Sequence, residues 1–124
     1  KKSINRAMSV SVADEYAVVN ATDTMAMYEE IYEMTDGKMA DVVINVVNIP
    51  NTEMASIMAC KDNGLVYFFS MATSFTKAAL GAEGVGKDVQ MLIGNGYTKG
   101  HANVALQILR EDERIRNLFA QLYA

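Results

Sequence analysis

The sequence contains a single cysteine, Cys60, so a disulfide bond within the chain is excluded. A lone thiol fits a reducing compartment, and we expect a cytoplasmic protein. No apolar run approaches the roughly 18 residues that a membrane span requires. No pattern typical of a signal peptide is present either. These absences predict a protein with no membrane partner.

Clustered basic residues are also scarce. Lys and Arg number 11 against 15 Asp and Glu, which gives a formal net charge of −4. Nucleic-acid binding depends on clustered cations that contact phosphates. The only adjacent basic pair is Lys1 with Lys2, at the start of the chain. We therefore expect no nucleic-acid partner.

Short apolar runs without helical spacing are present instead, at residues 16–20, 42–47, 65–69 and 89–93. Such runs are typical of strands buried on both faces of a parallel sheet. Helical patterns alternate with them, at residues 25–32, 51–61, 74–80, 102–109 and 115–122. Either Thr22 or Asp23 can cap the first of these helices. The sequence predicts one α/β domain over residues 1–124, with a partial Rossmann-like parallel sheet of about four strands flanked by helices.

Small or amide side chains follow these apolar runs: Asn20, Asn48, Ser70, and Gly94 with Asn95. The carboxyl ends of parallel strands share one edge of the sheet, and ligands bind outside that edge. The pattern therefore indicates a ligand site there. An alternative stays open, because Asn and Ser also favour the start of turns.

Two stretches carry a resemblance to known dehydrogenases. The stretch "VADEYAVVNATDTMAMYEEIYEMTDGKMADVVINVVN" resembles the second half of the nucleotide-binding domain of medium-chain dehydrogenases. The stretch "VYFFSMATSFTKAALGAEGVGKDVQMLIGNGYTKGHA" is similar, more specifically, to the L-erythro-3,5-diaminohexanoate dehydrogenase family. The resemblance covers residues 12–110, and the first ten and last dozen residues add little to it.

The resemblance implies an NAD(P)-dependent amino-acid dehydrogenase of lysine fermentation. This family oxidatively deaminates 3,5-diaminohexanoate to 5-amino-3-oxohexanoate, with NAD or NADP as the hydride acceptor. The implied partners are this small-molecule substrate and the nicotinamide nucleotide. Matching of strand ends places Asn48 and Ile49 near the cofactor ribose. The same matching implies nicotinamide contacts from Phe69, Ser70, Met71, Ile93, Gly94 and Asn95.

The pattern departs from a complete dinucleotide fold, because no G-x-G-x-x-G turn with a downstream acidic residue is present. We therefore expect a fragment that lacks the glycine-rich first strand–helix unit and is inactive alone. The edge of the strand at residues 42–47 is then left uncovered. Either the strand at residues 16–20 pairs beside it, or another chain does, and we expect a homo-oligomer.

The catalytic residue stays unassigned. His101 is the only histidine, but no nucleophile or carboxylate is spaced to form a triad with it. Cys60 has no second cysteine or nearby histidine, so we expect no metal site. The alternative function is a non-catalytic nucleotide- or small-molecule-binding module that completes its sheet with a partner chain.

Overall fold

The structure, a computed structural model, describes residues 2–70, 72–94 and 98–123. The described chain divides into two compact units. Residues 19–94 form the sheet unit, and residues 2–18 with 98–123 form the helical unit. Each unit is described separately below.

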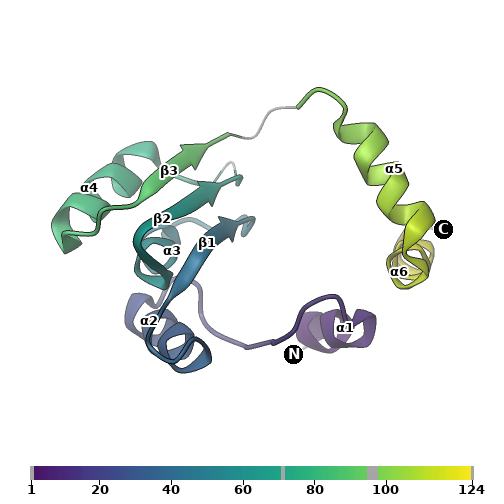
Figure 1. Cartoon of the computed structure of the whole chain (residues 1–124), viewed down its shortest axis with the longest axis horizontal. Helices are drawn as coiled ribbons and strands as arrows, with labels where there is room; N and C mark the ends of the chain where they lie inside the picture. The colour runs from purple at the N-terminus through teal and green to yellow at the C-terminus, as the bar shows by residue number, and fades with distance from the viewer. Residues whose placement is uncertain (1, 71, 95–97, 124) are drawn as a thin grey trace. The chain divides into compact units, whose positions relative to one another are not determined.

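The sheet unit contains a parallel sheet of three strands in the order β1-β2-β3 (Figure 1). The strands are β1 (Ala40–Asn45), β2 (Cys60–Phe68) and β3 (Gln90–Ile93). Helix α3 (Glu53–Ala59) connects β1 to β2, and α4 (Phe75–Val85) connects β2 to β3. Helical connections of this kind are what parallel neighbours require. The predicted α/β class is confirmed, with a parallel sheet flanked by helices.

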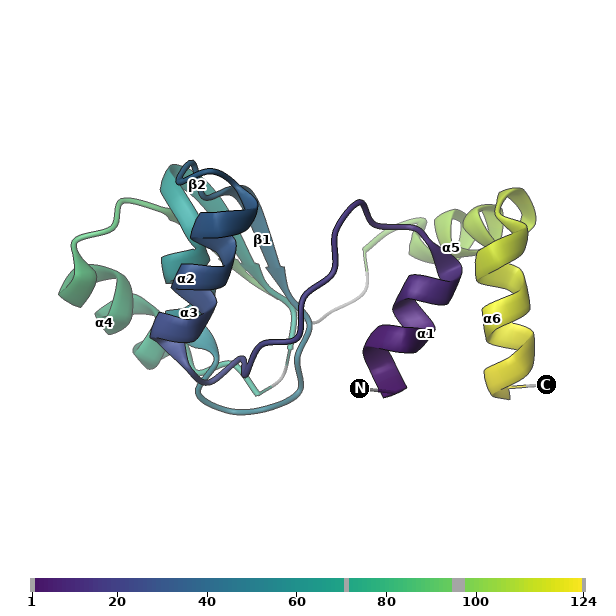
Figure 2. The same ribbon diagram turned by 90° about the horizontal axis from the view of Figure 1, so that it is seen from below.

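Helices cover one face of the sheet. Helix α2 (Thr24–Met34) packs against α3, and α3 packs against α4 (Figures 1 and 2). Beneath them, Val66 and Phe68 of β2 are fully buried and share a core with Ile57 of α3 and Ala78 of α4. Alternate strand residues point to the same face. The sequence of β2 therefore directs every second side chain into this core.

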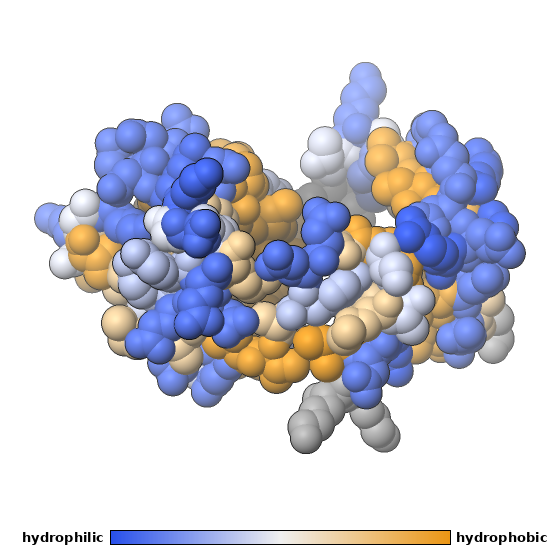
Figure 3. All heavy atoms as spheres, turned by 60° about the horizontal axis from the view of Figure 1, so that its bottom comes forward, coloured by the Kyte–Doolittle hydropathy of each residue, from blue (hydrophilic) through white to orange (hydrophobic). Residues whose placement is uncertain are grey.

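The opposite face of the sheet carries apolar side chains that remain exposed. Ile44 pairs in register with Tyr67, and Tyr67 pairs with Leu92. Ile44 is 64% exposed and Leu92 is 51% exposed, and Val42, on the same face, is 53% exposed. Figure 3 shows apolar surface exposed among hydrophilic side chains on one side of the molecule. Among the described residues of the sheet unit, no helix packs on this face.

The prediction of a strand at residues 16–20 is wrong. These residues have no regular secondary structure, and Val18 is 70% exposed. A strand forms only where a neighbour supplies hydrogen bonds, and the free edge of β1 has no such partner among the described residues. The first of the two outcomes expected for that edge is therefore wrong. Pairing with another chain stays a prediction.

Two helices end at other residues than the predicted ranges, which stopped at residues 61 and 80. The pair Asn63 and Gly64 lies inside β2, where β2 residues between Cys60 and Leu65 bulge opposite Asp41. Helix α3 consequently ends at Ala59, earlier than expected. Helix α4 continues through Gly81, and its left-handed cap is Gly86. The Met54 side chain occupies the space beside Gly81, so the missing Cβ serves packing there.

The other helix predictions are confirmed. Asp23 caps α2, and its carboxylate accepts a 3.0 Å hydrogen bond from the Ala26 amide. In the helical unit, α5 (His101–Glu111) and α6 (Glu113–Tyr123) contain the ranges that the spacing of apolar residues predicted. Helix α1 (Lys2–Val10) was not expected. None of the described helices has both the length and the apolar character needed to cross a membrane.

Candidate functional site

The ends of the three strands lie side by side at one edge of the sheet. The Phe69 amide donates to the Asn45 carbonyl oxygen over 3.0 Å. The Gly94 amide donates to the Phe68 carbonyl oxygen over 3.1 Å. These two bonds continue the parallel hydrogen-bonding pattern by one residue past the ends of β2 and β3. The structure thus brings Phe69 and Gly94 to neighbouring strand ends, as the parallel pattern predicts.

The remaining predicted site residues lie around this edge or in its loops. Asn48 and Ile49 lie three and four residues past the end of β1, and both are exposed. Phe69 is 45% exposed and stacks on Tyr67 with ring centroids 6.1 Å apart. Ile93 is the last residue of β3 and is 42% exposed. Two predicted positions, Met71 and Asn95, lie outside the described residues.

Two of the polar residues that were predicted to follow strands organise turns. The Asn20 side-chain oxygen accepts from the Thr22 amide at 3.0 Å and from the Thr22 hydroxyl at 2.7 Å. The Ser70 hydroxyl oxygen accepts from the Ala72 amide at 3.1 Å. Both side chains thus make the local turn contacts that Asn and Ser favour, and the site prediction for Ser70 stays a prediction. Asn20 follows no strand, so it does not share the edge with the others.

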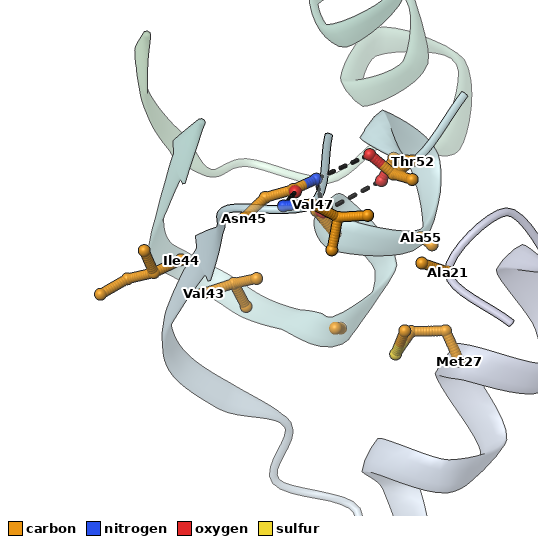
Figure 4. A pocket seen from close by; sticks show the side chains of 10 residues that line it. Ala21, Met27, Val43, Ile44, Asn45, Val47, Thr52 and Ala55 are labelled. Atoms are coloured by element: carbon orange, nitrogen blue, oxygen red, sulfur yellow. Dashed lines mark hydrogen bonds between the residues drawn. The ribbon is translucent and has the colours of Figure 1, made fainter. Parts of the chain in front are cut away.

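A buried polar network that the sequence analysis missed holds the loop after β1 (Figure 4). The Asn45 side-chain nitrogen donates to the Thr52 hydroxyl at 2.8 Å and to the Ser56 hydroxyl at 2.9 Å. Its side-chain oxygen accepts from the Val47 amide at 3.0 Å. Asn45 is only 5% exposed. The network therefore ties the end of β1 to the start of α3 and fixes where the loop with Asn48 leaves the sheet.

Sequence signals for this network were present. Asn45 is the one polar residue within the apolar run at residues 42–47. Thr52 and Ser56 stand four residues apart, which places both hydroxyls on one side of a helix start. An amide inside an apolar strand needs hydrogen-bond partners nearby, and a hydroxyl pair at helical spacing supplies them.

A small cavity of about 130 Å³ lies between β1, α2 and α3. Figure 4 shows Val43, Met27 and Ala55 on its walls, with Asn45 at the network. Pockets for drug-sized ligands are typically about 300–1,000 Å³. A nicotinamide nucleotide is therefore too large for this cavity, which is an irregularity in the packing around the network.

Charged and titratable groups add little to the strand-end edge. Burial raises the pKa of the Cys60 thiol, which fits a buried structural residue. His101 belongs to the helical unit, where its Nδ1 lies 2.8 Å from the Thr98 carbonyl oxygen. No three potential ligands among His, Cys, Asp and Glu gather within the described ranges.

Comparison with known proteins identifies relatives of this chain. An L-erythro-3,5-diaminohexanoate dehydrogenase from Acetoanaerobium sticklandii is 51% identical over 123 residues, which is 99% of this chain. A second protein with that name, from Fusobacterium nucleatum subsp. nucleatum, is 49% identical over 120 residues, or 95% of this chain. No protein-family model matches. The resemblance found in the sequence is confirmed, and it extends beyond residues 12–110 to almost the whole chain.

The match covers only part of each relative. The chain spans 36% of the Acetoanaerobium protein and 35% of the Fusobacterium protein. The region that this chain matches is therefore about a third of the length of each relative.

Proposed function

We propose that this chain is part of an NAD(P)-dependent amino-acid dehydrogenase that acts on 3,5-diaminohexanoate. The observation that carries this proposal is the identity of about half of all residues with two L-erythro-3,5-diaminohexanoate dehydrogenases, over nearly the whole chain. The α/β fold with its parallel sheet agrees with a nucleotide-binding role. A single buried thiol fits a reducing cytoplasm.

The proposed reaction is the oxidative deamination of the 3-amino group to give 5-amino-3-oxohexanoate. A bound nicotinamide would supply the hydride chemistry: it would accept a hydride from the amine-bearing carbon, while the amine nitrogen releases a proton to solvent. The resulting substrate imine is hydrolysed by water, and ammonia leaves. The contribution of this chain is to position the cofactor ring and ribose at the carboxyl edge of the sheet.

We assign the cofactor contacts to the loops that follow the strands. Asn48 and Ile49, exposed after β1, are placed by the Asn45 network and would contact the ribose. The nicotinamide contacts are the strand-end residues Phe69, Ser70, Met71, Ile93, Gly94 and Asn95. The hydrogen bonds that align Phe69 and Gly94 support this assignment. The turn that binds the pyrophosphate would come from another part of the longer enzyme.

The free edge of β1 supports the proposal that the sheet is larger in the complete enzyme. An unpaired edge presents a row of free amide and carbonyl groups. A further strand from the longer polypeptide, or from a second copy in a homo-oligomer, would satisfy them. The chain by itself is then inactive because half of the nucleotide site is missing.

An assay of the complete enzyme tests the proposal. NADH or NADPH formation from 3,5-diaminohexanoate, followed at 340 nm, should require that substrate. Asn48→Ala should raise KM for the nucleotide and leave protein stability unchanged, because Asn48 is exposed. Nucleotide binding without turnover of any diamino acid would favour the non-catalytic binding module instead.

A further inference from the structure

Glu53 is a buried carboxylate that has no hydrogen-bond partner for one of its oxygens. It is the first residue of α3 and is only 2% exposed. Its Oε2 atom is buried, and no described residue donates a hydrogen bond to it. A buried polar group without a partner carries a large free-energy cost. Glu53 therefore needs a donor that the described chain does not supply.

Glu53 lines a cavity of about 410 Å³, within the range of small-molecule sites. The cavity lies among the starts of α2 and α3 and the first half of α4, where Thr24, Met54 and Leu80 complete its walls. It is distinct from the smaller cavity beside Asn45. Met54 and Leu80 give it apolar surface, so it suits a ligand with an aliphatic part.

A cation stands on the same cavity wall. Lys77 of α4 lines it, and its ammonium group donates a hydrogen bond to the side-chain oxygen of Asn51. Lys77 and Glu53 form no ion pair, because the ion pairs of the described residues are Asp41 with Lys61 and Asp112 with Arg114. Both residues therefore line the cavity without pairing with each other. A lysine ammonium has three donors, so two remain beyond the bond to Asn51.

We propose that this cavity binds an aliphatic amino acid, with its ammonium group on Glu53 and its carboxylate on Lys77. The ammonium group donates the hydrogen bond that Glu53 lacks, and charge-assisted bonds of this kind are strong. The carboxylate accepts from the free donors of Lys77. The aliphatic stem lies against Met54 and Leu80. This binding site is separate from the strand-end residues, and the inference does not rest on the proposed function.

Calorimetric titration of the complete protein that carries this chain tests the site. The probes are 5-aminopentanoate, which has both charges, n-pentylamine, which has only the cation, and pentanoate, which has only the anion. We expect saturable binding of 5-aminopentanoate that is tighter than binding of either single-charge probe. Absence of saturable binding at millimolar concentrations, or equal affinity for n-pentylamine and 5-aminopentanoate, would overturn the proposal.

Two variants assign the contacts. Glu53→Gln should weaken 5-aminopentanoate binding by about tenfold or more, because the charged acceptor is lost. Lys77→Met should reduce the affinity for 5-aminopentanoate to that for n-pentylamine, and Lys77 is exposed, so folding is not at risk. Glu83→Gln is the matched control, since Glu83 is an exposed α4 carboxylate outside the cavity walls. Unchanged binding in both Glu53→Gln and Lys77→Met would show that the probe binds elsewhere.

Discussion

The Asn45 side chain makes three hydrogen bonds within the sheet unit. It is buried, and it bonds to the hydroxyls of Thr52 and Ser56 and to the Val47 amide. We expect Asn45→Ala to lower the free energy of unfolding by about 1–3 kcal/mol, because buried polar groups lose their partner. Urea denaturation of the complete protein measures this. Asn48→Ala is the control, and an equal loss in both variants would contradict the role given to the network.

Two glycines make a matched pair with opposite expected effects. A Cβ at Gly64 would lie 2.9 Å from the carbonyl oxygens of both Asp41 and Lys61, whereas a Cβ at Gly84 would meet nothing within 4 Å. Gly64→Ala should destabilise the protein by about 1–3 kcal/mol, since backbone must move. Gly84→Ala, inside α4, should stabilise it by about 0.5–1 kcal/mol through lower unfolded-state entropy. Thermal denaturation distinguishes the two, and a neutral Gly64→Ala would refute the packing at the β2 bulge.

At the scale of elements, sequence patterns predicted helices correctly where contacts within the helix itself determine the structure. Helix α2 has an apolar stripe along its length and a capping residue, Asp23, at its start. In α5 and α6, apolar residues recur at helical spacing over three turns. The same patterns failed where tertiary contacts decide. Residues 16–20 have strand composition but pair with no strand among the described residues. Helix α4 passes through Gly81, whose missing Cβ makes room for the Met54 side chain.

The candidate site also has features that the sequence could predict and features that it could not. The meeting of strand ends follows from parallel order, so the sequence could predict that Phe69 and Gly94 lie at adjacent ends. The contacts of Asn45 and Glu53 depend on which helix packs over which strand. The sequence marks Asn45 as an amide inside an apolar run, but it does not show which hydroxyls that amide meets. Glu53 reads as an ordinary first residue of a helix and gives no such signal.

Helix α6 begins with a charged cap whose effect depends on pH. The Asp112 carboxylate accepts from the Arg114 amide at 2.9 Å and pairs with the Arg114 guanidinium at 2.8 Å. The guanidinium bond, aided by backbone amides, lowers the pKa of Asp112 to about 2. Because the folded-state pKa is depressed, the stabilisation is present above the ordinary value of 3.8 and is lost as pH falls through about 2.

We therefore expect an NMR titration of the Asp112 carboxyl carbon to give a pKa of about 2. Asp112→Asn should remove this part of the acid dependence of α6 helicity, measured by circular dichroism between pH 5 and pH 2. Glu113→Gln, next in sequence, is the control and should retain it. A titration of Asp112 at the ordinary aspartate value would contradict the Arg114 contact.

At the scale of the whole molecule, β1 is the element whose surroundings should change most. It has a free edge and an exposed apolar face in the described chain, where Val42 and Ile44 are more than half exposed. Strand β2 is bonded on both sides, so its amides should exchange slowly in any context. In the isolated 124-residue chain we expect β1 to exchange with solvent deuterium much faster than β2.

In the complete enzyme, a strand paired beside β1 would protect the amides that do not bond to β2. Hydrogen exchange followed by mass spectrometry should then show β1 protected almost as well as β2, with the change confined to the β1 peptide. The β2 peptide serves as the internal reference, because its two neighbours are present in both samples. Equal exchange of β1 in the isolated chain and in the complete enzyme would mean that no strand is added at this edge, and the larger-sheet proposal would fall.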